Sequence, residues 1–333
     1  IFLPKNSTPN SIKIMSKAFK LFTFHGQGST FDIANIAFQD ITISHLYKNR
    51  FKDYCLAKEC YQPQVISLLS NLKYQDQLLQ FGENVNKTLT NSAIIGHSLG
   101  ELQFLSCNKL IGIEDLMDIA TKRNNLMIEQ MNFYKDDNDI TEDEWISSYS
   151  LMISPKLMKT QPSYIEDALV PKLNDSIGKG SLSLSLHNTK NSIVLTGLSS
   201  DFEILFKEDK GGDKTISKKL KLPNNSQNAF HNNKFLKRIE EPLNDYIFKK
   251  LVKNKHSHIE NLDIPVFSSY SNKLNHKVTD AMTDFTKSSF NTIPFYKNNI
   301  TLKEYIKEND YELERFDIGP STVLTSILNK NGL

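Results

Sequence analysis

Short apolar runs alternate with longer amphipathic stretches along the first part of the chain. Residues 18–24 and 93–95 are compact and apolar, and a glycine-containing turn follows each of them, which predicts two buried strands. Residues 64–72 carry apolar side chains at spacings of three and four, and residues 113–131 continue this helical period over several turns. Alternating strand-like and helix-like units predict an α/β fold built on a parallel sheet.

The pattern changes after residues 133–144, a polar stretch that predicts a linker or an exposed loop. Strand-like and helix-like runs then follow in the order β-α-β-β-α, at residues 149–154, 163–173, 181–187, 193–197 and 199–207. This order predicts a small ferredoxin-like α+β subdomain. Helical periodicity returns at residues 235–252, and strand-like runs follow at 264–268 and 313–317.

These changes of pattern predict a division of the chain into a leader at 1–18, a hydrolase-like α/β catalytic core at 19–144 and 221–333, and the ferredoxin-like subdomain at 145–220. The predicted leader carries three lysines and no acidic residue, and the chain starts at Ile1. That composition suits the remnant of an organellar targeting segment. We therefore expect the mitochondrial matrix as the location, with the cytoplasm as the alternative.

Composition excludes some classes of protein. The 39% hydrophobic and 23% charged residues are ordinary for a globular protein, and a net charge of +2 is too small to indicate a nucleic-acid or membrane partner. No apolar stretch reaches the ~18 residues of a membrane span. Cys55, Cys60 and Cys107 are too few for a disulfide framework and lack zinc-site spacing, which predicts reduced thiols in an intracellular compartment.

The strongest chemical signal is the sequence Gly96-His97-Ser98-Leu99-Gly100. Small residues on both sides of a serine permit a tight strand-to-helix turn that exposes the hydroxyl. A short apolar run precedes this turn and a helical segment follows it, which is the context that a nucleophilic serine requires. Ser98 is therefore the candidate nucleophile, and the amide groups at the start of the next helix favour a developing oxyanion.

A nucleophilic serine needs a base, and the chain has eight histidines. His97 adjoins the serine, but its side chain leaves the turn in another direction, so it is structural or lines the pocket. His25 lies in a glycine turn, and His231 follows an aromatic residue at the start of a helical segment. Spacing alone does not choose among the histidines.

Several motifs, taken together and in this order, resemble the malonyl-CoA:acyl carrier protein transacylases. They are Phe24-His25-Gly26-Gln27-Gly28-Ser29, Gln62-Pro63, Gly96-His97-Ser98-Leu99-Gly100-Glu101, Arg123 with Leu126-Met127, Asn188 nine residues before Gly197, Ala229-Phe230-His231, and Gly319-Pro320 with Val323-Leu324. Each motif is weak alone, and the set covers residues 20 to 325. The most specific is the serine motif, which matches without a change.

The resemblance implies roles for these residues. Ser98 and His231 are expected as nucleophile and base, and the backbone N–H groups of Gln27 and Leu99 as the oxyanion hole. Arg123 and Asn188 are expected to bind the substrate, with the guanidinium on the free malonyl carboxylate. Malonyl-CoA and an acyl carrier protein are the implied partners of a monomeric enzyme that needs no cofactor and no metal.

The sequence departs from the family at two places. His25 stands where the family has proline, and Thr30 where a glutamine often follows the first motif. The family also carries a glutamine four residues before a Pro-Val segment, and the backbone carbonyl of that glutamine orients the histidine. Spacing from Pro294 places Phe290 at that position. A carbonyl does not depend on side-chain identity, so Phe290 is the predicted orienting residue.

Two other functions share part of this pattern. A serine thioesterase or hydrolase of acyl-CoA has the same elbow, but gives the glycine turn and Arg123 no role. A non-enzymatic scaffold that has kept the fold is the second alternative. For Arg123, the alternative to substrate binding is an ordinary exposed position on a surface helix. Basic residues after His231, at Lys234, Lys237 and Arg238, are either solvated surface or a docking face for the carrier protein.

Overall fold

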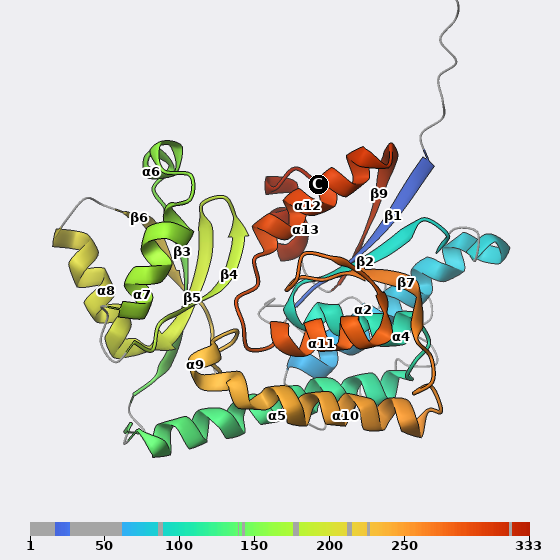
Figure 1. Ribbon diagram of the computed structural model, residues 1–333, viewed down its shortest axis with the longest axis horizontal. Coiled ribbons are helices and arrows are strands. Elements are labelled where there is room, and N and C mark those ends of the chain that lie inside the picture. The colour runs from blue at the N-terminus through green and yellow to red at the C-terminus, as the bar shows by residue number, and fades with distance from the viewer. Residues whose placement is uncertain are drawn as a thin grey trace, which may run out of the picture.

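A computed structural model describes residues 17–26, 62–85, 89–138, 140–141, 144–175, 180–211, 215–224, 227–319 and 322–333. Two separate sheets organise these residues, a five-stranded one and a four-stranded one. In Figure 1 the small sheet and its helices lie to the left, and the large sheet with the remaining helices lies to the right. The predicted α/β class is confirmed. The predicted leader falls on residues outside the described part, apart from Lys17 and Ala18, which begin the first strand.

The large sheet has the order β8-β7-β2-β1-β9. Its strands are β1 (Lys17–Phe24), β2 (Ser92–Gly96), β7 (Asn261–Phe267), β8 (Leu274–Lys277) and β9 (Tyr311–Ile318). The four strands from β7 to β9 in this order pair in parallel, and β8 joins the edge antiparallel to β7. Parallel neighbours need helical crossovers, which is why apolar runs alternate with helices along the sequence.

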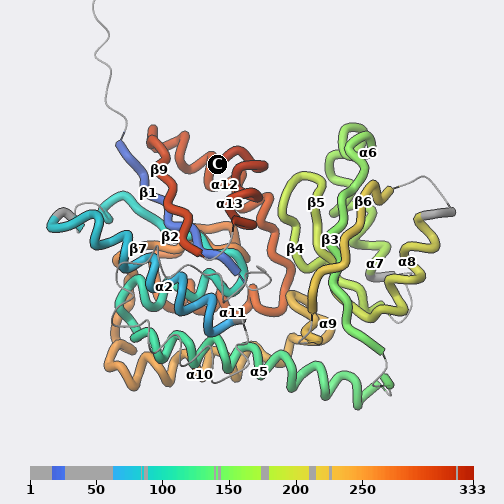
Figure 2. Tube along the Cα trace, turned by 180° about the vertical axis from the view of Figure 1, so that it is seen from behind, coloured from blue at the N-terminus to red at the C-terminus, as the bar shows by residue number. Residues whose placement is uncertain are grey.

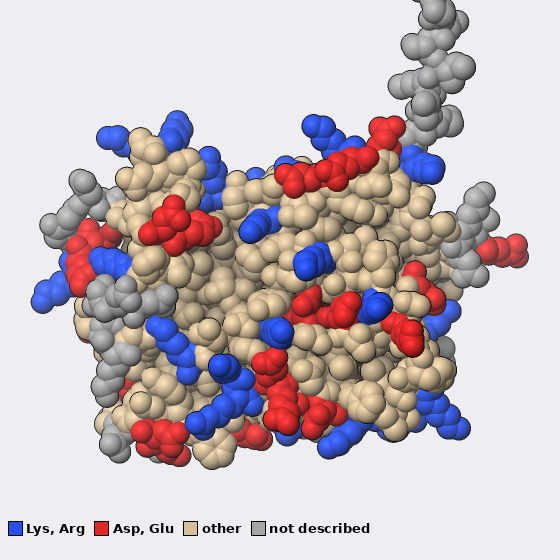
Figure 3. Space-filling view, in the orientation of Figure 1, with Lys and Arg blue, Asp and Glu red and all other residues tan. Residues whose placement is uncertain are grey.

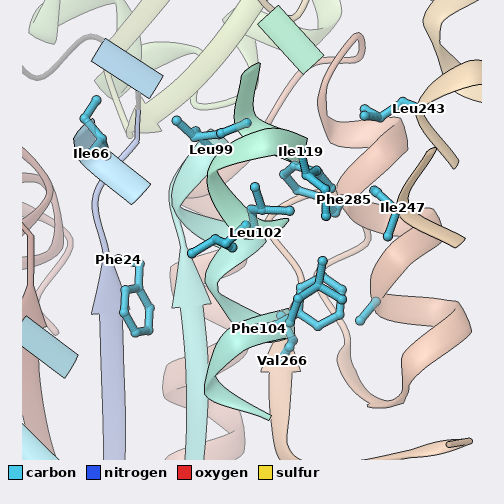
Figure 4. Close-up of a cluster of buried hydrophobic side chains, with 14 of the residues drawn as sticks. Phe24, Ile66, Leu99, Leu102, Phe104, Ile119, Leu243, Ile247, Val266 and Phe285 are labelled. Atoms are coloured by element: carbon cyan, nitrogen blue, oxygen red, sulfur yellow. The ribbon is translucent and has the colours of Figure 1, made fainter. Parts of the chain in front are cut away.

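Both faces of the large sheet are covered, as the side-chain alternation of β1 shows. Phe22 and Phe24 pack into one hydrophobic cluster, whereas Phe19 and Leu21 pack into another on the opposite face. The first face carries α2 (Gln62–Phe81), α4 (Gln103–Cys107), α5 (Ile113–Asp137), α10 (Glu240–Lys253) and α11 (Val278–Ser288); the second carries α12 (Phe295–Glu308) and α13 (Val323–Lys330). Figure 4 shows part of the first cluster, where Leu99 and Leu102 lie between the strands and the helices.

The small sheet has the order β4-β5-β3-β6, and all its pairs are antiparallel. Its elements follow one another as β3 (Ile146–Ile153), α6 (Pro155–Thr160), a π-helical turn η5 (Ile165–Leu169), α7 (Val170–Asp175), β4 (Ser183–Thr189), β5 (Ser192–Leu198), α8 (Ser199–Gly211) and β6 (Ile216–Lys221). A β-α-β-β-α-β order with the first and third strands in the centre is the ferredoxin-like arrangement. The last strand, β6, was not predicted, because half of its residues are lysine and most of them are exposed.

Two segments, one at Ile293 and one at Asn232, tie the small sheet to the rest of the molecule. Edge strand β4 forms a parallel bridge to Ile293, since His187 N donates to the Ile293 carbonyl at 3.0 Å and Ile293 N donates to the Ser185 carbonyl at 2.9 Å. Asn232, just before the short helix α9 (Asn233–Leu236), donates its amide to the Ser181 and Thr196 carbonyls. Figure 2 shows α9 between the small sheet and the long helices α5 and α10.

Two sequence expectations differ from the structure in extent. The helix predicted at 235–252 is divided into α9, a 3-10 turn η6 (Lys237–Ile239) and α10, because Leu236 leaves helical geometry with φ −110° and ψ 1°. Helix α5 continues to Asp137, into the stretch predicted as a linker. The division into three parts stays a prediction. Acidic and basic side chains are interspersed over the face in Figure 3, and no helix of the described residues is long and apolar enough to cross a membrane.

Candidate active site

The serine motif forms a sharp turn between β2 and the 3-10 helix η4 (Ser98–Leu102). Ser98 has φ 55°, a left-handed conformation that costs a non-glycine residue about 1–2 kcal/mol. Close packing holds it there, because a Cβ on Gly96 would lie 2.0 Å from the Glu101 nitrogen and one on Gly100 would lie 2.1 Å from the Phe24 carbonyl oxygen. The motif glycines are therefore required by backbone contacts with neighbouring segments, and the contacts hold the Ser98 backbone in its strained conformation.

The structure brings Ser98 and His231 together although 133 residues separate them. The Ser98 Oγ lies 2.8 Å from His231 Nε2, and both residues are buried. On the other side of the ring, Nδ1 lies 2.5 Å from the Ser288 carbonyl oxygen. A carbonyl only accepts, so Nδ1 carries the hydrogen, and Nε2 accepts from the Ser98 hydroxyl. This tautomer is the one in which the imidazole can take the serine proton.

The orienting carbonyl is that of Ser288, which corrects the prediction of Phe290. Helix α11 ends at Ser288, and the amides that follow it bond to earlier carbonyls: Ser289 N to Thr286 and Phe290 N to Lys287. The Ser288 carbonyl is left without a helical partner and turns to the histidine. Phe290 instead buries its side chain in the large hydrophobic cluster. Spacing from Pro294 gave the wrong residue because it does not fix where helix α11 ends, and the orienting carbonyl lies at that end.

The electrostatic surroundings keep His231 neutral. Burial, and after it the nearby Arg123 charge, lower the pKa of His231 to about 3, against the opposing effect of the Ser288 carbonyl. At neutral pH the ring is therefore a free base. The Ser288 carbonyl at the end of α11, where the helix dipole is negative, favours the imidazolium that forms when the ring takes a proton.

Arg123 lies inside the site and not on a surface helix. Its side chain on α5 has no exposed area, its Nε donates to Ser289 Oγ at 2.8 Å, and its Nη2 donates to Ser98 Oγ at 3.4 Å. Burial lowers the pKa of Arg123 to about 10, so the group remains charged at neutral pH. The alternative of a solvated helix residue is wrong. A fully buried cation beside the serine hydroxyl is suited to hold an anionic group of a substrate.

The small sheet reaches the site through Asn188 on β4. Its Oδ1 lies 3.0 Å from His97 Nε2, and its backbone carbonyl accepts from Asn331 at 2.8 Å. The His97 ring also packs edge-on against Phe295, with ring centroids 5.0 Å apart. His97 thus lines the wall of the site and connects it to the small sheet, in line with the structural role expected from its place in the sequence. Asn188 therefore contacts the residue that directly precedes Ser98 on the elbow.

The structure describes Leu99 but not Gln27, the two residues expected to form the oxyanion hole. Leu99 is buried at the start of η4, directly after the serine, where its N–H can face the reacting carbonyl. Gln27 lies outside the described residues, as do Thr30, Cys55 and Cys60. The described cysteine, Cys107, is a buried free thiol. Within the described ranges, no group of three His, Cys, Asp or Glu side chains is placed to hold a metal ion.

Sequence reasoning missed Ser288 and Ser289. Ser288 supplies the carbonyl to His231, and Ser289 supplies a hydroxyl to Arg123. A usable signal was present, since a pair of serines closes a strongly amphipathic helix just before a buried Phe-x-x-Ile segment. Polar residues at a helix end often make the hydrogen bonds that the helix leaves open.

Comparison with known proteins agrees with this geometry. No family model matches the chain. The mitochondrial malonyl CoA-acyl carrier protein transacylase of Saccharomyces cerevisiae is 27% identical over 342 residues, which cover 94% of this chain and 92% of the relative.

Two solved structures share the fold. The malonyl CoA-acyl carrier protein transacylase of Coxiella burnetii has a TM-score of 0.68 at 14% identity, covering 96% of this chain and 92% of its own. A malonyl-transacylase in complex with a type II PKS acyl-carrier protein has a TM-score of 0.66 at 16% identity, covering 95% and 93%.

The mostly parallel five-stranded sheet, the separate four-stranded antiparallel sheet and the match to the solved transacylase structures define an α/β acyltransferase fold, which here carries the serine–histidine pair. Within that class, the chain is similar over almost its whole length to the mitochondrial malonyl CoA-acyl carrier protein transacylase of yeast.

Proposed function

We propose that this chain transfers a malonyl group from malonyl-CoA to the phosphopantetheine thiol of an acyl carrier protein, through an acyl intermediate on Ser98, for fatty acid synthesis. The observation that carries the proposal is the position of Arg123. Its buried guanidinium lies 3.4 Å from the Ser98 Oγ that His231 contacts at 2.8 Å. A nucleophile, a base and a cation for a free carboxylate therefore meet at one point.

In the first half of the reaction, the Ser98 oxygen attacks the thioester carbon while its proton passes to His231 Nε2. The backbone N–H groups of Leu99 and Gln27 are the proposed donors to the oxyanion. The carbon–sulfur bond then breaks, and His231 gives the proton to the departing sulfur, so that CoA leaves as the thiol and the ring is again a free base. The products of this half are free CoA and malonyl-Ser98.

In the second half, the carrier thiol gives its proton to His231 and its sulfur attacks the malonyl ester. The ester bond breaks, Ser98 regains the proton, and the carrier leaves as malonyl thioester. Arg123 holds the malonyl carboxylate in both halves, and Asn188 closes the pocket from the small sheet. Because burial holds the pKa of His231 near 3, the ring is free to take the proton at neutral pH.

The carrier protein and the location follow from the relatives. One relative of known structure is a malonyl-transacylase bound to an acyl-carrier protein, and the yeast relative is mitochondrial. We therefore propose an acyl carrier protein as acceptor and the mitochondrial matrix as location. The basic residues Lys234, Lys237 and Arg238 near the site are the proposed docking face, and the enzyme is proposed to act as a monomer.

The test is a loading assay with malonyl-CoA and the holo form of an acyl carrier protein, followed by mass spectrometry of carrier and enzyme. We expect a malonyl adduct on the Ser98 peptide before the carrier is added and on the carrier afterwards. Release of free malonate without a loaded carrier would instead identify a hydrolase. An enzyme that never acquires the adduct would be a scaffold.

A further inference from the structure

The mechanism above leaves one buried acid beside the nucleophile without a role. Glu101 lies on η4, three residues after Ser98, and its side chain has no exposed area. Its Oε2 is hydrogen-bonded to the Ser269 hydroxyl and lies 3.4 Å from the Ser269 nitrogen. Among the described residues, its Oε1 has no hydrogen-bond partner. A carboxyl oxygen without a partner is tolerated far better on a neutral acid than on an anion.

The backbone of Glu101 is fixed to the elbow. A Cβ on Gly96 would lie 2.0 Å from the Glu101 nitrogen and 2.2 Å from its Cα, so the two backbones already touch. One 3-10 helix carries Ser98, Leu99 and Glu101. The Glu101 side chain therefore cannot move outward to reach water unless the turn that carries the nucleophile moves with it.

The charged groups around Glu101 favour the neutral form. Asp284, on the packed helix α11, is held by Ser271 and Asn275 and repels a second anion. Other elements packed on η4 bring the titratable groups Tyr74 on α2, Cys107 on α4 and Arg123 on α5. Within the described residues, the groups that bond to the Glu101 carboxyl come from the neighbouring Ser268 and Ser269.

We propose that Glu101 is a positioning residue, which holds the nucleophile elbow in its reactive geometry as a neutral acid, and that loss of its proton disables Ser98. As an anion, the fully buried Glu101 would need hydrogen-bond donors for both oxygens, and its Oε1 has none among the described residues. The closed pocket would open, η4 would shift, and the Ser98 Oγ would leave the 2.8 Å contact with His231. The inference rests on the proposed function only in taking Ser98 as the nucleophile.

The pH at which this happens follows from the surroundings. Burial, with repulsion by Asp284, raises the pKa of Glu101 to about 8 against the opposing hydrogen bonds from Ser269 and Ser268. The base His231, whose pKa is about 3, does not titrate in this range. Arg123, whose pKa is about 10, begins to titrate only at the upper end of the range. A loss of reactivity centred near pH 8 therefore has its origin in Glu101 and not in the base or in Arg123.

The experiment measures the rate at which a fluorophosphonate labels Ser98 between pH 6 and pH 10, with no malonyl-CoA present. For the wild-type chain we expect a plateau at low pH and a rate about tenfold lower at pH 9, since one ionisation near pH 8 leaves roughly a tenth of the acid protonated. Glu101→Gln keeps the shape of a neutral acid and should hold its own plateau through pH 9. Glu304→Gln, an exposed acid on α12, is the matched control and should keep the wild-type profile.

A second variant tests the same idea without touching Glu101. Asp284→Asn removes the repelling charge, which lowers the pKa of Glu101 and should move the loss of labelling to lower pH. An alkaline loss that is unchanged in both Glu101→Gln and Asp284→Asn would overturn the proposal. So would a wild-type rate that stays flat to pH 10.

Unfolding measurements give a readout that does not need activity. Glu101 binds its proton more tightly in the folded than in the unfolded chain, so wild-type stability should fall as pH rises from about 4.5 toward 8. Glu101→Gln should remove this fall, and an identical pH dependence in both proteins would contradict a neutral Glu101. A chain in which Ser98 is never labelled would refute the proposed nucleophile instead, and one that labels but does not load a carrier would refute only the transfer reaction.

Discussion

The two sides of the active site are built in opposite ways. On the serine side, Gly96 to Glu101 form one strand, one turn and one short helix, and every contact that strains Ser98 involves that segment. On the histidine side, the end of α11 holds both His231 and Arg123 through hydrogen bonds. The chain next to His231 is also held, by hydrogen bonds from Asn232 to the small sheet. The serine is placed by local sequence, and its partners are placed by the tertiary fold.

This difference teaches where the site can be damaged. The serine side depends on the absence of side chains at Gly96 and Gly100, where a Cβ would meet backbone atoms of Glu101 and Phe24, so it tolerates no substitution there. The histidine side depends on hydrogen bonds from Ser288 and Ser289. Substitutions far from the reacting atoms should therefore disturb the base His231 and the proposed carboxylate-binding residue Arg123, while Ser98 stays in place.

The largest effect is expected from Ser98→Ala, which removes the nucleophile and leaves the fold. Acyl-enzyme formation should fall below detection by mass spectrometry after mixing with malonyl-CoA. The matched control is Ser326→Ala, an exposed serine on α13. Persistent labelling of the Ser98→Ala protein at another residue would show that the serine side has been assigned to the wrong segment.

Arg123→Ala tests the proposed binding of the malonyl carboxylate by the guanidinium on the histidine side. A charge-assisted bond to a carboxylate contributes about 1.5–3 kcal/mol, so malonyl transfer should fall roughly 10- to 150-fold while acetyl transfer falls much less. Separate kcat/KM values for malonyl-CoA and acetyl-CoA measure this. Lys122→Ala on the same helix is the control, and equal losses for the two substrates would remove Arg123 from the substrate site.

Ser289→Ala should weaken carboxylate binding indirectly, by removing a residue that positions Arg123. It deletes the hydroxyl that accepts from Arg123 Nε at 2.8 Å, a bond that contributes about 1 kcal/mol, so malonyl transfer should fall roughly fivefold. Ser288→Ala is the matched comparison, because the Ser288 hydroxyl bonds to the Phe285 carbonyl and its own carbonyl to the histidine is retained. If both variants lose activity equally, the helix end acts as one unit and Ser289 has no separate role.

The smallest effect on activity is expected from Asp115→Asn, which breaks a contact between α5 and α10 away from the site. Burial would raise the pKa of Asp115, but hydrogen bonds from Asn254, Lys250 and Lys253 outweigh it and lower the pKa to about 2. Because the folded pKa lies below the unfolded value, this stabilisation is present above about pH 4 and is lost as pH falls through 2.

Asp115→Asn should therefore reduce the free energy of unfolding by about 2 kcal/mol at pH 7, with kcat/KM unchanged. Denaturant unfolding at pH 7 and at pH 2.5 measures the difference, which should shrink at the lower pH. Asp118→Asn, an exposed partner of Lys250, is the control and should cost much less. A pH-independent difference would mean that the loss comes from packing and not from charge.

Sequence patterns predicted the parts of the fold that depend on local periodicity. The strands at 18–24 and 93–95, helix α5 and the ferredoxin-like order all appear in the structure. Strand β6 did not follow from its pattern, since an edge strand of lysines has no apolar alternation and is held by pairing with β3. The break at Leu236 was also missed, because tertiary packing and not a proline or glycine divides that helix.

The same limit applies to the site. Ser98 follows from its motif, whereas His231 and Arg123 needed the family resemblance to single them out among eight histidines and many basic residues. The carbonyl at Ser288 could not be found by spacing, because the identity of a free helix-end carbonyl depends on where the helix stops. Local sequence therefore predicts the nucleophile, and only the folded chain identifies what orients the base.

The backbone bridge between β4 and Ile293 has a consequence for protein engineering. An exchange of residues 145–220 for the matching segment of a relative would leave the chain connections intact but place a foreign edge strand beside Ile293, five residues after the carbonyl that orients the histidine. A chimera of this kind should lose catalysis before it loses solubility. A better chimera would exchange residues 288–293 together with the small sheet. The exchanged part would then contain both the segment that pairs with β4 and the carbonyl that orients the histidine.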